Sequence, residues 1–237
     1  MEELAKHTWL YLGNSLIAAL IVLGLLSAAA AKKERVPGRF QNFFEFALDG
    51  LRNMFLGALG PGGEKHLPIV LTLFFYILIG NFLGMVPALR SPTAATSVTI
   101  ALGIVTIVYV HISAIQAKGV GGYLKHFLGP VMALAPLFIF IEIVGEIAKP
   151  FSLAMRLFGN IFGEDQIVEQ IYHAMGTSVI AHLIPVQVVV NLLQAFTNLI
   201  QAFIFALLTC GYLVAMTDTS HDDEHGHDAP PHAIAAE

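Results

Sequence analysis

"IEIVGEIAKPFSLAMRLFGNIFGE" (residues 141–164) combines a long apolar run with charged and amide side chains at helical spacing. On a helix that turns about 100° per residue, these polar side chains fall within an arc of roughly 120°. Such a stripe cannot face lipid, because hydrocarbon would leave each polar group without a hydrogen-bond partner. The stretch predicts a long membrane helix whose polar side faces protein or water. The polar stripe consists of Glu142, Glu146, Lys149, Ser152, Arg156, Asn160 and Glu164.

The composition places the whole chain in a membrane. Of its 237 residues, 56% are hydrophobic and 12% are charged, and the mean hydropathy is +0.73. Soluble domains carry about a quarter charged residues, so this chain has more apolar surface than one soluble core could bury. The net charge of −5 comes largely from the C-terminal tail, and no basic face suggests nucleic-acid binding. The single cysteine, Cys210, excludes a disulfide framework and is interpreted as inert packing.

Apolar runs over residues 8–31, 67–89 and 96–117 are long enough to span a bilayer as helices. The first run follows a leader that is not basic and exceeds the core of a signal peptide, about 7–15 residues, so we expect a retained helix rather than a cleaved signal. The cations within residues 32–39 place its second end in the cytoplasm and the N-terminus outside. Residues 40–60 mix aromatic and charged side chains, as in an amphipathic helix at the interface.

Two longer segments, residues 131–172 and 177–216, are predicted to form steeply tilted helices packed as an antiparallel pair. The second carries amides at steps of four, three, four and three residues, within about 80° of arc. Amides can line a wet passage or bond to a facing helix, and both readings stay open. The tail, residues 217–237, is predicted to be disordered, although its histidines also have a spacing open to metal. The chain forms one predicted membrane domain, residues 1–237. The amide row consists of Gln187, Asn191, Gln194, Asn198 and Gln201.

Arg156 is the residue of the polar stripe whose charge most needs an explanation. An arginine keeps its proton at any cellular pH, so it cannot relay protons but can hold a carboxylate ionised. At about 4 Å and an effective dielectric near 20, that attraction is on the order of 4 kcal/mol. Glu142 and Glu146 lie about 15 Å or more along the helix, and Glu164 about 12 Å. Unless another helix of this chain supplies an acid, the partner carboxylate belongs to a different chain.

"AKPFSLAMRLFGN" (residues 148–160) and "LLQAFTNLIQAFIFALLT" (residues 192–209) resemble subunit a of the bacterial F-type ATP synthase, and the likeness covers essentially the whole chain. The resemblance implies a stationary, non-catalytic subunit in the bacterial plasma membrane, with its C-terminus in the cytoplasm and no cofactor. Its partners would be a ring of c subunits, b-type peripheral stalk subunits and the remainder of the synthase. Two offset aqueous half-channels would meet the ring on either side of the arginine, so that ion flow turns the ring.

The family's functional residues can be carried over by position. The stator arginine falls on Arg156, and the acid nine residues later falls on Asp165. Gln194 stands where some members carry histidine, a role that His173 or His182 could take over if they are not structural. The interpretation assigns Asn160, Glu164, Asp165 and Gln201 to the external half-channel and Glu142 and Glu146 to the cytoplasmic one, with Gln194 and Asn198 also on the ion path.

Two other functions remain open at this point. A self-contained secondary transporter could use Glu142 or Glu146 as its titratable site, although no inverted repeat is visible. A passive membrane anchor would tolerate substitution of Arg156. The coupling ion, H⁺ or Na⁺, is set mainly by the ring's own site.

Overall fold

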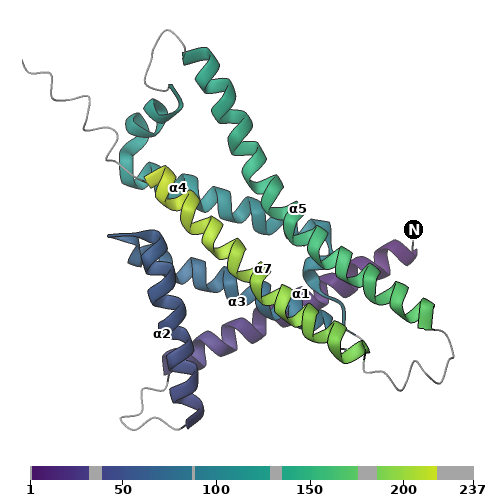
Figure 1. Ribbon diagram of the computed structural model, residues 1–237. Helices are drawn as coiled ribbons and strands as arrows, with labels where there is room; N and C mark the ends of the chain where they lie inside the picture. Colours follow the sequence, from purple (N-terminus) through teal and green to yellow (C-terminus); the bar gives the residue numbers. More distant parts are fainter. Residues whose placement is uncertain (1, 32–38, 87–88, 129–134, 176–185, 218–237) are drawn as a thin grey trace, which may run out of the picture.

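The fold is described from a computed structural model, which covers residues 2–31, 39–86, 89–128, 135–175 and 186–217. Every regular element within these residues is helical, so the prediction of an all-α chain is confirmed there (Figure 1). The elements are α1 (Glu2–Ala31), α2 (Arg39–Leu59), the 3-10 helix η1 (Gly63–His66), α3 (Leu67–Gly84), the 3-10 helix η2 (Pro92–Ala94), α4 (Thr96–Leu128), α5 (Ala135–Met175) and α7 (Val186–Thr217).

Three of the described segments are long and apolar enough to cross a membrane: Gly63–Gly84, Thr96–Leu124 and Val188–Thr217. The apolar part of α1, Tyr11–Ser27, is shorter. Helix α5 is longer than any of them, but its charged residues interrupt every apolar run of spanning length. The chain is therefore a membrane protein in which one long helix differs in polarity from its neighbours.

One helix end differs from the predicted boundary: α3 ends at Gly84 rather than near residue 89. The range Thr96–Leu128 of α4 contains two helical segments joined by a kink at Gly119, so the first segment ends close to the predicted residue 117. At the kink, Gly119 has a φ of 70°, which favours glycine. The predicted starts at residues 131 and 177, the tail from residue 218 and His182 lie outside the described residues.

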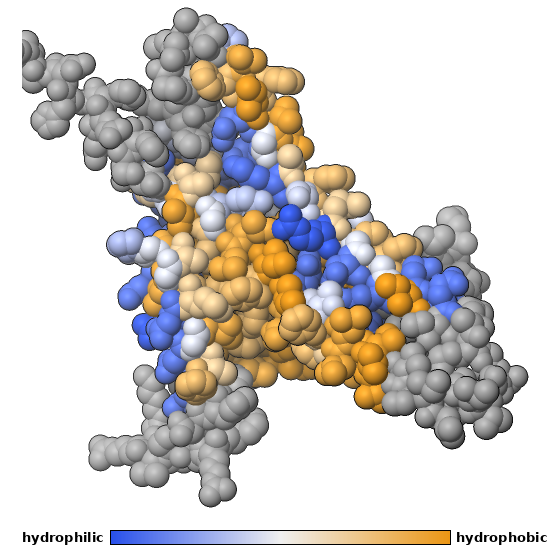
Figure 2. Space-filling model, in the orientation of Figure 1, coloured by the Kyte–Doolittle hydropathy of each residue, from blue (hydrophilic) through white to orange (hydrophobic). Residues whose placement is uncertain are grey.

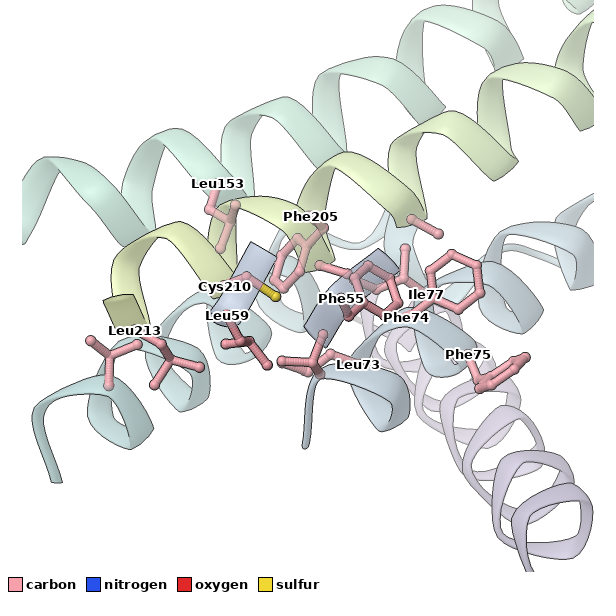
Figure 3. Packing of buried hydrophobic residues seen from close by; sticks show 14 of the residues in the cluster. Phe55, Leu59, Leu73, Phe74, Phe75, Ile77, Leu153, Phe205, Cys210 and Leu213 are labelled. Carbon is pink, nitrogen blue, oxygen red and sulfur yellow. The ribbon is translucent and has the colours of Figure 1, made fainter. Parts of the chain in front are cut away.

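The core lies where α2, α3 and α7 meet (Figure 3). Phe55 of α2 is fully buried, and its ring lies 5.8 Å from Phe74 of α3 and 5.8 Å from Phe203 of α7, measured between ring centroids. On the other side of α2, Asp49 and Arg52 are exposed. The amphipathic pattern of residues 40–60 thus gives α2 a face that packs on protein.

Helix α5 contacts α4 closely along its middle. A Cβ atom added to Gly103 of α4 would lie only 2.8 Å from the carbonyl oxygen of Pro150. Pro150 has no amide hydrogen, yet α5 continues through it. The absence of a side chain at Gly103 is therefore what lets α4 approach the backbone of α5 at this point.

Helix α5 also runs against α7, in the opposite direction. Lys149, early in α5, lies near Tyr212, late in α7. Asn160 and Glu164, later in α5, share a cleft with Gln194 and Thr197, earlier in α7. Figure 1 shows the later part of α5 and the earlier part of α7 side by side. The polar stripe of α5 is thus bordered by α4 at one level and by α7 at another.

Candidate ion path along helix α5

Arg156 projects from the outer face of α5. Leu153 and Leu157, on an adjacent side of the helix, are 3% and 0% exposed and pack in the core, whereas Ser152 and Arg156 are exposed. Among the described residues, no side chain forms an ion pair or a hydrogen bond with the Arg156 guanidinium. Figure 2 shows hydrophilic surface crossing an otherwise hydrophobic face along the course of α5. The fixed charge therefore faces outward from this chain.

A cleft of about 330 Å³ lies between α5 and α7 on one side of Arg156. Its polar lining comes from Asn160 and Glu164 of α5 and from Gln194 and Thr197 of α7. The amide of Asn160 donates a hydrogen bond to the Glu164 carboxylate at 3.1 Å. Gly163 also lines the cleft, and an added Cβ there would meet no atom within 4 Å. The missing side chain leaves this part of the cleft open.

The amide row divides between this cleft and the protein interior. Gln194 lines the cleft, whereas Asn198 and Gln201 are only 1% and 6% exposed and do not line it. Asn191 is exposed. Asp165 and His173 belong to α5, and Gln187 belongs to α7. The side chains of these three residues lie outside the described part of the structure, so the predictions for them stay predictions. Of the predicted site residues, the structure thus gathers Asn160, Glu164 and Gln194 around one space.

A cluster of paired polar side chains lies on the other side of Arg156. Glu146 forms an ion pair with Lys149, and its second oxygen lies 3.2 Å from Nε2 of His111 on α4. The Tyr123 hydroxyl lies 3.2 Å from Nδ1 of the same imidazole. The ammonium of Lys149 lies 5.8 Å from the ring centroid of Tyr212. We call these five residues the paired cluster; Glu142, half-buried, lies one helical turn before it.

The sequence interpretation missed His111 and Tyr123. It considered acids as partners for the stripe, and neither residue is acidic. The available signal was a histidine within the apolar run of residues 96–117, where an unpartnered imidazole would be unfavourable. Periodicity along α5 could not show that α4 brings this histidine to Glu146.

The described residues contain no group of three or more histidine, cysteine, aspartate or glutamate side chains that could hold a metal ion. Cys210 is fully buried in the core, between α7 and its neighbours. The histidines of the tail, whose spacing would also allow metal binding, lie outside the described residues. The described side chains at this site offer a fixed charge, carboxylates, an imidazole and amides.

Comparison with known proteins decides the family. A sequence model described as ATP synthase A chain matches residues 12–214. The chain belongs to this family. The resemblance recognised in residues 148–160 and 192–209 is thus confirmed.

Curated bacterial relatives cover nearly the whole chain. It is 38% identical over 221 residues to "ATP synthase subunit a" of Syntrophobacter fumaroxidans, covering 93% of this chain and 87% of that protein. It is 35% identical over 219 residues to "ATP synthase subunit a 3" of Pelobacter propionicus, covering 92% and 89%. It is 34% identical over 215 residues to "ATP synthase subunit a" of Geobacter sulfurreducens, covering 91% and 87%.

Proposed function

We propose that this chain is the stationary, ion-conducting subunit in the membrane sector of a rotary ATP synthase. It is non-catalytic on its own and assembles with a c-subunit ring, b-type stalk subunits and the rest of the complex. The observation that carries the proposal is the position of Arg156, which is exposed and has no ionic partner among the described residues. A membrane protein would leave such a charge outward only where a partner of opposite charge meets it.

Arg156 acts on carboxyl groups that move past it. A ring carboxyl is neutral while it faces lipid and becomes ionised beside the guanidinium, because an opposite charge favours the ionised form. The ion that it releases leaves on one side, and another is taken up on the other side. The fixed charge blocks a direct leak between the two sides, so that about 2.3 kcal/mol per charge per 100 mV becomes available for rotation.

The two polar regions of α5 and its neighbours suit two separate half-channels. The cleft with Asn160, Glu164 and Gln194 forms the external one, together with Asp165. Gln201 of α7 also belongs to this half-channel and Asn198 to the ion path, although both side chains are buried and do not line the cleft. Glu142 and Glu146 belong to the cytoplasmic half-channel, near the paired cluster. This assignment places the N-terminus outside and the C-terminus in the cytoplasm of a bacterial plasma membrane.

Replacing Arg156 by glutamine tests the proposal. Arg156→Gln removes the charge and keeps a long polar side chain, so we expect the complex to assemble and gradient-driven ATP synthesis to be abolished. Arg52→Gln is the matched control, because Arg52 is an exposed arginine of α2 away from the stripe. The measurement is ATP synthesis by membrane vesicles per assembled complex.

The same variants separate the proposal from its alternatives. Normal synthesis in Arg156→Gln would contradict the stator role and favour a passive anchor. Ion transport by the purified chain alone in liposomes would favour a self-contained transporter, whereas a stator conducts only with its ring.

A further inference from the structure

His111 is held at both ring nitrogens. Nε2 lies 3.2 Å from the Glu146 carboxylate, and Nδ1 lies 3.2 Å from the Tyr123 hydroxyl. The Nε2 atom lies within ion-pair distance of Oε2 of Glu146, although the contact is not a hydrogen bond. The two contacts together place the imidazole between the carboxylate and the tyrosine hydroxyl.

The bend in α4 makes this arrangement possible. His111 and Tyr123 are 12 residues apart, a spacing that a straight helix would stretch to about 18 Å along its axis. Gly119 lies between them, and its φ of 70° turns the last part of α4 back toward the first. The kink thus has a definite consequence: it brings the Tyr123 hydroxyl to the histidine.

Glu146 depends on His111 for one of its two oxygens. The Glu146 side chain is only 10% exposed, and a carboxylate so far from water needs a partner at each oxygen. Lys149 contacts Oε1, whereas Oε2 has no hydrogen-bond partner among the described residues and lies 3.2 Å from Nε2 of His111. Lys149 in turn lies over the Tyr212 ring of α7. Within the described part of the chain, the titratable or charged groups that contact this pair or Lys149 are thus Tyr123, Lys149 and Tyr212, and Glu142 lies one helical turn before Glu146.

We propose that His111 is a positioning residue for Glu146, oriented by Tyr123 and acting on the cytoplasmic half of the ion path. The inference rests on the proposed function, since it gives a role to Glu146 there. Without the imidazole, Oε2 loses its contact with Nε2, and the carboxylate turns toward Lys149 or toward water. The acid is then displaced from the place that the ion path requires.

Variants of His111 test this role through ATP synthesis per assembled complex. His111→Leu removes the donor, and we expect the rate to fall roughly tenfold, as when other groups that orient a functional side chain are removed. His111→Gln keeps an N–H near the position of Nε2, and we expect it to restore most of the rate. Tyr123→Phe removes a single oxygen and is expected to lower the rate less than His111→Leu does.

His66 supplies a matched control. Its Nδ1 lies 3.0 Å from the Tyr109 hydroxyl, and the two rings meet at 88°, compared with 85° for His111 and Tyr123. Within the described part of the chain, however, His66 forms no ion pair with a carboxylate. His66→Leu therefore removes an equivalent histidine–tyrosine pair away from Glu146, and we expect the rate per complex to stay near that of the unmodified protein.

A double-mutant cycle with Glu146→Gln gives the decisive readout. If His111 acts through Glu146, His111→Leu has no further effect once Glu146 is glutamine. An equal loss in both backgrounds, or an equal loss in His66→Leu, would overturn the proposal. If His111→Leu does not assemble, Tyr123→Phe decides, and an unchanged rate there would also overturn it. Arg156→Gln in the same assay distinguishes failure of the proposed function from failure of this inference. Normal synthesis in Arg156→Gln would contradict the proposed function. Lost synthesis in Arg156→Gln together with a normal rate in His111→Leu would contradict this inference alone.

Discussion

The polar stripe of α5 passes through two different environments. Before Arg156, Glu146 and Lys149 are paired with each other and tied to α4 through His111. After Arg156, Asn160 and Glu164 border an open cleft shared with α7. The two regions lie on one helix and one face, yet one is closed by neighbouring side chains and the other is hollow.

The difference comes from the residues of the neighbouring helices. Gly103 lets α4 press against α5 near Pro150, where the paired cluster begins. Gly163 removes a side chain from α5 where α7 runs beside it, and the cleft remains open. Between these regions, Arg156 has no ion-pair or hydrogen-bond partner within the described chain. The periodicity of α5 thus sets where each polar group lies, and the small residues decide whether the space beside that group is filled or open.

The largest effect within the open region is expected from filling it. Gly163→Leu places a side chain in free space within the cleft, so it should exclude water without displacing the backbone. We expect ATP synthesis and passive ion conduction to fall by an order of magnitude or more, because an apolar constriction blocks hydration. Gly24→Leu, an exposed position on α1 that also has free space, is the control. Undiminished conduction in Gly163→Leu would show that ions do not cross this cleft.

A smaller effect is expected where α4 meets α5. Gly103→Ala puts a Cβ 2.8 Å from the Pro150 carbonyl oxygen, so the helices must separate. We expect a loss of about 1–3 kcal/mol in stability, as in other overpacked contacts, and a partial loss of ATP synthesis. Thermal unfolding in detergent measures the first, with Gly121→Ala, which has free space around its Cβ, for comparison. Equal stability of the two variants would mean that the close approach is relaxed in the membrane.

The smallest effect on function is expected from a cysteine placed in the cleft for thiol labelling. Its rate of labelling should differ strongly from that of the native cysteine in the core. Gly163→Cys should react quickly with a water-soluble thiol reagent, because the cleft admits water. The native Cys210, which is 0% exposed, should react only after denaturation. Mass spectrometry after brief labelling measures both thiols in one protein. Labelling of Cys210 at a comparable rate would contradict the packing described for the core.

Much of the fold could be predicted from the sequence, because helices in a membrane keep the usual helical periodicity. The sequence predicted an all-helical chain, a polar stripe centred on Arg156, and the lack of an acidic partner close to Arg156 along its own helix. It could not separate Gln194 from Asn198 and Gln201, since one periodic row contains all three while only the first lines the cleft. It also could not pair His111 with Glu146, because that contact depends on how α4 crosses α5.

The kink in α4 shows a further limit. The sequence predicted the end of the third apolar run near residue 117, but it did not show that a second helical segment follows Gly119 and runs to Leu128. The contact of Tyr123 with His111 depends on that second segment, so it could not be predicted from the apolar run.

The most direct test of the central claim is the structure of the assembled complex with its ring, in which the distance from the Arg156 guanidinium to the nearest carboxylate can be measured. The account predicts that this carboxylate belongs to a ring subunit, within about 4–6 Å of the guanidinium. An Arg156 that faces acyl chains, or that pairs with Glu142, Glu146 or Glu164 of its own chain, would contradict it.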